Sequence, residues 1–388
     1  MANTLGYYNP VFYANEALIW LSKALGMAGR VHRGYDEERR AFDRGQVVNI
    51  RRPSIMTVAD APATAADLTT ESVQVSLDYW RESKFKLTDR EIAYTGNRVI
   101  EEHIMPAAYA LADDIDQKLA LLYKDVPYFH DIAGGASTTA VVADVTAARK
   151  ILFDNQVPLA DESKVHLMAD SGMEKALLDL AAFSQWQGSG TSGVETQMRG
   201  QLGKRYGMNI FANQNVQSHT PGTCNDTALL INNGAGYAVG ISTINLDAAD
   251  AGVAGTLVAG DVLTIGSYKY VVTATNTASG NAFTGVTISP ALKAAVVDNA
   301  VVTARIDTHI AAMAFQRDAF ALVMARLPDY TNFDGLGAKV ASVQDPVTGL
   351  AVRARVYYVG NSSEVHVALD ALYGVKTLNP YMAVRICG

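Results

Sequence analysis

The most regular spacing of apolar and polar residues lies between Ser72 and Asp125. From Ser72 to Leu87 apolar side chains alternate with polar ones, which predicts a β-strand with one buried face. From 97 to 125 apolar residues recur at steps of three and four, which predicts an amphipathic helix. The residues on its apolar stripe are Ile100, Ile104, Ala108, Leu111, Ile115, Leu119 and Leu122. Such a helix would extend about 43 Å, and Pro106 within it predicts a bend or a limit to its first turns.

The N-terminal residues predict a second amphipathic helix. Asn9 followed by Pro10 is a helix-start signal, because Asn caps and Pro is favoured at the first helical position. One face of this helix is formed by Ala14, Ala17, Leu18, Leu21, Ala24, Leu25 and Ala28. Tyr13, Ile19 and Trp20 add apolar surface outside that face. One partner surface therefore cannot bury every apolar side chain of the helix.

Two segments between these helices are expected to be exposed. The mixed charges from Arg30 to Arg52 predict a solvated connector, with a short strand from Gln46 that Pro53 terminates. Residues 53 to 71 are too many for a tight hairpin turn and too poor in large apolar residues to pack on themselves. They predict either a loop that reaches out from the body or a disordered surface loop, and the residues alone favour neither.

The rest of the chain predicts a mixed α and β unit with a β-rich block inside it. Helices are expected at 141–153 and 172–183, a strand at 165–169, and a helix or apolar strand at 319–324. From His219 to about Arg305 short strand signals follow one another, which predicts a small barrel or sandwich inserted into a host domain. The candidate strands are 228–232, 237–244, 261–265, 268–274, 285–289 and 300–306. Alternation on both sides of the turn at 360–363 predicts a hairpin of two long strands.

Composition excludes several classes of protein. The chain has 388 residues, of which 49% are hydrophobic, so it can form a substantial core in two or three domains. No stretch has the length and apolar character of a membrane span or secretion signal. Cys224 and Cys387 are distant in sequence and indicate two unpaired thiols. The net charge of -7 argues against a general nucleic-acid binder.

No segment carries a convincing catalytic, cofactor or metal signature. Gly188 to Gly193 matches G-x-G-x-x-G, but it follows a predicted helix, whereas a dinucleotide site requires a preceding strand. Glu101-Glu102-His103 lacks the second histidine of a zinc-protease helix. Asp113, Asp114 and Asp116 are close together, yet a solvated helix face is favoured over a metal site. We therefore expect no enzyme activity, no cofactor and no metal.

The order of predicted elements resembles that of the major capsid proteins of tailed bacteriophages with the Hong Kong 97 (HK97) fold. The stretches that carry the resemblance are Thr70–Leu77, Phe85–Glu91, Pro106–Leu122, Asp318–Leu322 and Leu372–Leu378. Ala259–Ile265 and Val286–Leu292 in the β-rich block resemble the additional β domain of the coat-protein group typified by the Salmonella short-tailed phage. The resemblance covers nearly the whole chain.

This resemblance implies an α+β, HK97-like capsid fold with five parts. They are an N-terminal arm at 1–45, an extended hairpin loop at 46–78, a peripheral domain at 79–135 and 346–388 with its spine helix at 97–125, an axial domain at 136–216 and 309–345, and an inserted β-barrel-like domain at 217–308. The implied function is a major capsid protein that assembles into hexamers and pentamers, forming an icosahedral shell around double-stranded DNA without sequence-specific binding. The alternative is another virion structural protein, such as a decoration or tail component.

Contacts between subunits are expected from the apolar arm and the charged loop. The candidate residues are Tyr13, Ile19, Trp20, Arg51, Arg52, Asp60 and Asp67. Some members of the family that the chain resembles fuse a scaffolding segment to the N-terminus, whereas this chain passes from Met1 directly into its arm helix. The resemblance therefore implies a separate scaffolding protein. A portal is also expected as a partner, and no membrane. The expected location is the virion, with assembly in the host cytoplasm.

Overall fold

The computed structural model describes residues 10–33, 47–51, 61, 72–91, 98–185, 196–226, 228–248, 252–328, 338–344 and 350–388. The chain divides into two compact units. Unit 1 comprises Met1–Leu119 and Ala321–Leu378, and unit 2 comprises Ala120–Phe320 and Asn379–Gly388. The mixture of helices and strands confirms the α+β class that the sequence predicts.

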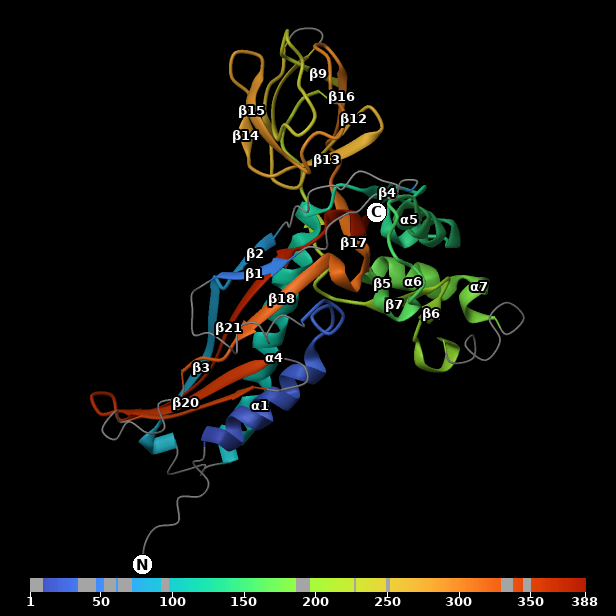
Figure 1. Cartoon of the computed structure of the whole chain (residues 1–388). Coiled ribbons are helices and arrows are strands. Elements are labelled where there is room, and N and C mark those ends of the chain that lie inside the picture. Colours follow the sequence, from blue (N-terminus) through green and yellow to red (C-terminus); the bar gives the residue numbers. More distant parts are fainter. Residues whose placement is uncertain are drawn as a thin grey trace, which may run out of the picture. The chain divides into compact units, whose positions relative to one another are not determined.

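In its described residues, unit 1 is built around a five-stranded sheet and two helices (Figure 1). The sheet order is β18-β21-β20-β19, and β3 also pairs with β21. The strands are β3 (Tyr79–Thr88), β18 (Phe320–Ala325), β19 (Ala338–Gln344), β20 (Ala351–Val359) and β21 (Glu364–Thr377). The two helices are α1 (Pro10–Ala24) and α4 (Arg98–Ala120), and β1 (Val47–Arg51) pairs with β2 (Ser72–Ser76) in a separate ladder.

The predicted spine helix is present, but it ends earlier than expected. Its α-helical part stops at Ala120 and continues as a 3-10 helix, η1 (Leu121–Asp125). Pro127 ends the 3-10 helix, because the residue before a proline is pushed out of the helical region, and Val126 has an extended conformation. Pro106 lies inside α4 and does not end it. The predicted stripe is buried from Ile104 to Leu119, and each of its buried Leu and Ile side chains contributes about 1.5–3 kcal/mol.

The single strand expected from Ser72 to Leu87 is wrong, because two strands occupy this stretch. β2 pairs with β1, whereas β3 pairs with β21 over ten residues from Tyr79 to Thr88. The side-chain alternation continues across the break at Leu77 and Asp78, so periodicity alone cannot reveal it. The hairpin predicted around residues 360–363 is confirmed, with Arg353 opposite Asp370 and Val359 opposite Glu364.

Unit 2 contains a seven-stranded sheet in the order β4-β22-β17-β5-β7-β6, with β8 paired to β17. Its strands are β4 (Phe129–Asp131), β5 (Val165–Ala169), β6 (Gly203–Arg205), β7 (Met208–Ala212), β8 (Ser218–His219), β17 (His309–Gln316) and β22 (Ala383–Cys387). Its helices are α5 (Val142–Asp154), α6 (Ser171–Asp179) and α7 (Ala181–Ser184). Val145, Leu167 and Val384 share its apolar core. The helix expected at 172–183 is interrupted at Leu180, whose backbone is extended.

Between β8 and β17 the chain forms a closed barrel with the order β10-β15-β13-β12-β16-β9 (Figure 1). Its strands are β9 (Ala228–Ile231), β10 (Thr243–Ala248), β12 (Val262–Ile265), β13 (Tyr268–Val272), β15 (Phe283–Ser289) and β16 (Val301–Arg305). A short pair, β11 (Thr256–Leu257) with β14 (Asn276–Thr277), accompanies it. The strand expected at 237–244 is displaced to β10, while Tyr237 makes only an isolated bridge to Val296.

The sheet pairings also correct two expected boundaries. Residues 321–345 were expected in the axial domain, but β18 and β19 belong to the sheet of unit 1. Residues 120–135 and 379–388 were expected in the peripheral domain, but β4 and β22 pair within the sheet of unit 2. The apolar pattern of a segment predicts that it forms a buried strand in a sheet. It does not predict which other strand pairs with that segment, because the partner is far away in sequence.

Candidate assembly surface

The N-terminal helix of unit 1 is anchored by one buried carboxylate. Asp116 of α4 is 3% exposed and accepts three hydrogen bonds from the turn after α1. Gly26 N–H donates to Oδ2 at 2.6 Å, Met27 N–H to Oδ2 at 3.2 Å, and Ala28 N–H to Oδ1 at 2.9 Å. Charge-assisted bonds of this kind are about twice as strong as neutral ones. The end of α1 is therefore fixed on α4.

The expectation of a solvated face for the three neighbouring aspartates is wrong for Asp116. Asp113 does lie on the exposed side, where Gln117 Nε2 donates to its Oδ2 at 2.8 Å. Asp114 accepts a hydrogen bond from the Tyr373 hydroxyl and lies 3.2 Å from Arg81 Nε. Burial, and next the bond to Asp114, raise the pKa of Tyr373 far above its ordinary value. Asp114 and Asp116 therefore each connect α4 to another element of unit 1, whereas the printed bond of Asp113 stays within α4.

An exposed apolar surface lies on α1 and α4, and we call it the arm patch. It consists of the exposed side chains of Phe12, Ile19, Met105 and Tyr109, together with the half-buried Trp20. Phe12 is 55% exposed and Ile19 is 53% exposed, while the rings of Trp20 and Tyr109 lie 6.1 Å apart. Large apolar side chains that cluster on a surface are typical of interaction sites.

The structure places the other predicted contact residues differently. Tyr13 is 1% exposed, so it is a core residue of unit 1 and offers no surface to another subunit. Arg51 lies on β1, with its backbone opposite Ser72. The side chain of Arg51, and residues Arg52, Asp60 and Asp67, lie outside the described part of the chain. Among the described members of the predicted set, Ile19 and Trp20 lie in the arm patch.

The sheet of unit 1 carries an ionic network on the face that includes Trp80. Asp370 is 0% exposed. It accepts hydrogen bonds from Arg353 Nε at 3.1 Å and from Arg353 Nη2 at 2.5 Å. Arg355 Nη2 lies 3.4 Å from Asp370 and 3.1 Å from Glu82. A buried carboxylate requires such partners, since an unpaired buried charge is strongly destabilising.

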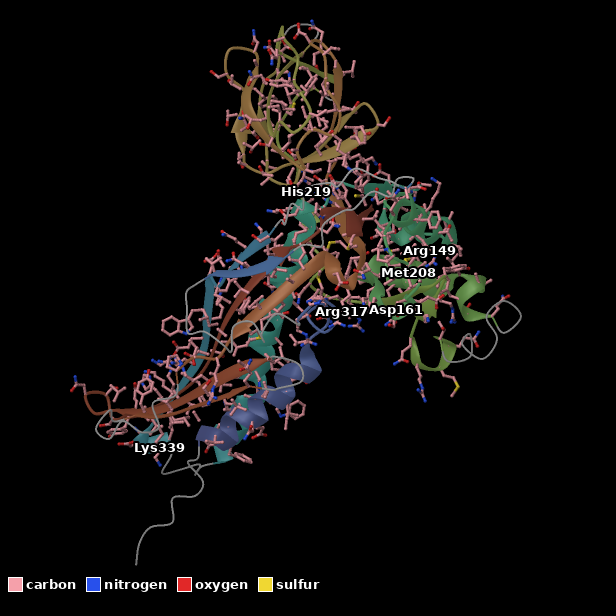
Figure 2. All side chains as sticks on the ribbon, in the orientation of Figure 1. Arg149, Asp161, Met208, His219, Arg317 and Lys339 are labelled. Atoms are coloured by element: carbon pink, nitrogen blue, oxygen red, sulfur yellow. The ribbon has the colours of Figure 1, made fainter. Side chains whose placement is uncertain are left out.

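Unit 2 contains a second buried polar cluster, where the barrel meets its sheet. The cluster is centred on His219, which is labelled in Figure 2. Its Nδ1 lies 2.9 Å from the Tyr123 hydroxyl, and its Nε2 lies 2.8 Å from Asp261 Oδ1. Asp261 also accepts bonds from the N–H groups of Val258 at 2.7 Å and Gly222 at 3.2 Å. His219 connects η1 with the barrel, because Asp261 immediately precedes β12.

Two further side chains complete this junction. Arg385 of β22 donates to the carbonyl oxygens of Gly260 at 2.8 Å and Lys124 at 3.3 Å, and burial lowers its pKa to about 10. His309 is opposite His219 in the β8–β17 pairing, and burial lowers its pKa to about 4. Sequence analysis missed this cluster. The available signals were the scattered charge at Asp261 and the change of composition near His219.

A cavity of about 450 Å³ lies at the same junction. Its lining includes Thr264 and Thr303 from the barrel, and Phe129, His309 and Cys387 from the sheet of unit 2. Both cysteines are buried and unpaired, and burial raises the pKa of Cys387 to about 11. Within the described ranges, no three His, Cys, Asp or Glu side chains gather as metal ligands.

Comparisons with known proteins find structural matches and no sequence matches. No family model matches the chain, and no curated protein matches it. A structure from Mycobacterium phage Che8 is 16% identical with a TM-score of 0.48, covering 93% of this chain and 90% of that chain. The capsid structure of cyanophage P-SCSP1u is 11% identical with a TM-score of 0.45, covering 89% and 84%. A virus-like particle from Pyrococcus furiosus is 10% identical with a TM-score of 0.40, covering 98% and 100%.

The element order itself agrees with the predicted family fold. An arm helix, paired loop strands, a long helix, an α/β sheet with an inserted barrel, and closing strands follow one another along the chain. No helix among the described residues has the length and apolar character needed to cross a membrane.

Proposed function

We propose that this chain is a major capsid protein, which assembles into hexamers and pentamers of an icosahedral shell around double-stranded DNA. The observation that carries the proposal is the element order. A long helix and a long-stranded sheet form one unit, and an α/β sheet interrupted by a barrel forms the other. The role is structural and depends on contact surfaces between copies. Two of the similar structures, the capsid of cyanophage P-SCSP1u and a virus-like particle from Pyrococcus furiosus, are in keeping with it.

The arm patch supports self-assembly. Aromatic side chains bury about 150–250 Å² each, and interfaces are enriched in Trp, Tyr, Phe and Met. The patch contains Phe12, Trp20, Met105 and Tyr109, together with Ile19. The Asp116 anchor fixes α1 before assembly, so less conformational entropy is lost when another copy covers the patch.

The charge of the chain is compatible with an enclosed polyanion. With a net charge of -7, the chain lacks the excess of Lys and Arg that sequence-independent DNA binding requires. A capsid wall with a net negative charge would let packaged DNA move along its inner surface. We further propose a separate scaffolding protein and a portal as partners, assembly in the host cytoplasm, and a final location in the virion.

Electron microscopy of the chain produced together with its candidate scaffolding protein tests the proposal. Closed icosahedral shells are expected, whereas tubes or discrete trimers would instead indicate a tail or decoration component. Ile19→Asp should reduce shell yield at least tenfold, because it places a charge in the arm patch. Ile19→Leu keeps an apolar side chain and should leave the yield within twofold. Circular dichroism should show both variants folded, and equal yields would remove the arm patch from the proposed contacts.

A further inference from the structure

Strand β3 lies at the margin of the unit 1 sheet (Figure 1). One of its edges pairs with β21 along all ten residues, from Tyr79 opposite Tyr373 to Thr88 opposite Glu364. In the described ranges β3 has no strand partner on its other edge. An open edge presents a row of backbone donors and acceptors that can pair with another strand. A ten-residue edge is long for such an element.

The two faces of β3 differ. Phe85 faces α4, where its ring lies 5.6 Å from the ring of His103, and Lys118 of α4 lies 5.6 Å from the ring of Tyr79. The opposite face carries Trp80, Glu82, Lys84 and Lys86, all of which are exposed. This face therefore presents one apolar ring followed by an acidic and two basic side chains at alternate positions.

Trp80 is held in place although it is 60% exposed. Its Nε1–H donates to Asp370 Oδ2 at 3.1 Å, and Asp370 is itself fixed by Arg353. The guanidinium carbon of Arg353 lies 5.9 Å from the centre of the indole ring. A Trp that is fixed and exposed offers contact area without a large loss of rotamer entropy on binding, which is a property of interface anchors.

The order of charges on this face is complementary to itself. If two copies of β3 pair antiparallel about a twofold axis at Ser83, Glu82 lies opposite Lys84 of the partner subunit. In the same register, the exposed ring of Trp80 lies opposite Lys86 of the partner subunit; within one chain, Lys86 Nζ lies 2.6 Å from Glu364 Oε1. Moving the axis by one residue to Lys84 would place Lys84 opposite its own copy, and like charges directly opposite are destabilising.

We propose that the open edge of β3 pairs antiparallel with β3 of a second copy of this chain, about a twofold axis at Ser83. This inference rests on the proposed self-assembly and names one contact within it. The contact is isologous, so the same surface serves both subunits. Backbone hydrogen bonds provide the pairing, as in strand addition to a sheet edge, and the Glu82–Lys84 pairs set its register.

Disulfide formation in assembled particles tests the register. Glu82→Cys combined with Lys84→Cys places two thiols opposite each other across the axis. Within one chain, positions two apart on a strand are too distant for a disulfide, so each bond must join two copies. Both native cysteines are buried, which limits the formation of disulfides that do not involve the introduced cysteines. Covalent dimers are expected under mild oxidation.

The matched control is Glu82→Cys combined with Lys86→Cys, whose thiols are diagonal across the proposed axis. It should give at least fivefold fewer dimers than the first pair. Equal dimer yields, or more dimers from the control, would overturn the register. Particles that form without covalent dimers in either variant would overturn the inference while leaving the proposed capsid function intact. Failure of the unsubstituted chain to form particles would overturn both.

Charge reversal at one position gives a second measurement that does not depend on oxidation. Lys84→Glu places acidic side chains opposite each other, and particle yield should fall at least tenfold. Lys84→Arg keeps the positive charge opposite Glu82 of the partner subunit, and yield should stay within threefold of the original. Equal yields from Lys84→Glu and Lys84→Arg, with thermal unfolding of the free subunit unchanged, would contradict the pairing.

Discussion

Replacing the buried carboxylate of Asp116 by an amide should loosen the N-terminal helix of unit 1. Asp116→Asn keeps the shape of the side chain but leaves one oxygen for three N–H donors, from Gly26, Met27 and Ala28. The new amide NH2 group points at backbone donors, so at least one of them loses its acceptor. A buried unsatisfied donor costs about 1–3 kcal/mol, and the lost charge weakens the remaining bonds. We expect unit 1 to lose about 3 kcal/mol.

Calorimetry of the unassembled chain at neutral pH measures this change. A loss of about 3 kcal/mol corresponds to a decrease in Tm of roughly 6–12 °C for a unit of this size. Hydrogen exchange should also accelerate at the amides of Gly26 to Ala28. The matched control is Asp113→Asn on the exposed side of α4, with an expected change below about 0.5 kcal/mol. If the two variants unfold within 1 °C of each other, the anchoring role assigned to Asp116 is wrong.

Two further predictions concern unit 2. Burial lowers the pKa of His309 from 6.5 to about 4, so between these pH values the unfolded chain binds a proton that the folded chain does not. The free energy of unfolding should therefore fall as the pH decreases from 6.5 to 4. Urea unfolding at pH 7 and at pH 4.5 measures this loss, and His309→Gln should make the loss smaller by about 2 kcal/mol. Gly260 has a φ of +103°, and an added Cβ would lie 3.0 Å from His219 Cε1 and 3.0 Å from Lys124 Cγ. Gly260→Ala should lower the urea midpoint more than Gly266→Ala, where an added Cβ meets no atom within 4 Å; equal midpoints would contradict the close packing at this junction.

Features that depend on local spacing could be predicted from the sequence. The strand at 165–169 and the hairpin around 360–363 follow the expected alternation, and the apolar stripe of α4 is buried as the helical period requires. The barrel was also visible, because short alternating strands separated by turns repeat along 219–305. These signals depend on neighbouring residues, and no distant contact changes them.

Features that depend on distant partners could not be predicted. Asp116 is a charged residue on an amphipathic helix, which predicts a solvated side chain. The N–H groups that donate hydrogen bonds to it lie 88 to 90 positions away in sequence. The exposed Trp80 is held by Asp370, which is 290 positions away. The assignment of β18 and β19 to unit 1 likewise depends on pairing within a sheet of sequence-distant strands. No periodicity in the sequence encodes these pairings, and one sequence carries no information on covarying positions.

Cryo-electron microscopy of particles from cells that produce this chain with the proposed scaffolding protein tests the central claim most directly. The proposed function predicts closed icosahedral shells, in which unit 1 and unit 2 of this chain fit every hexamer and pentamer. Tubes, isolated trimers or persistent monomers under the same conditions would contradict it.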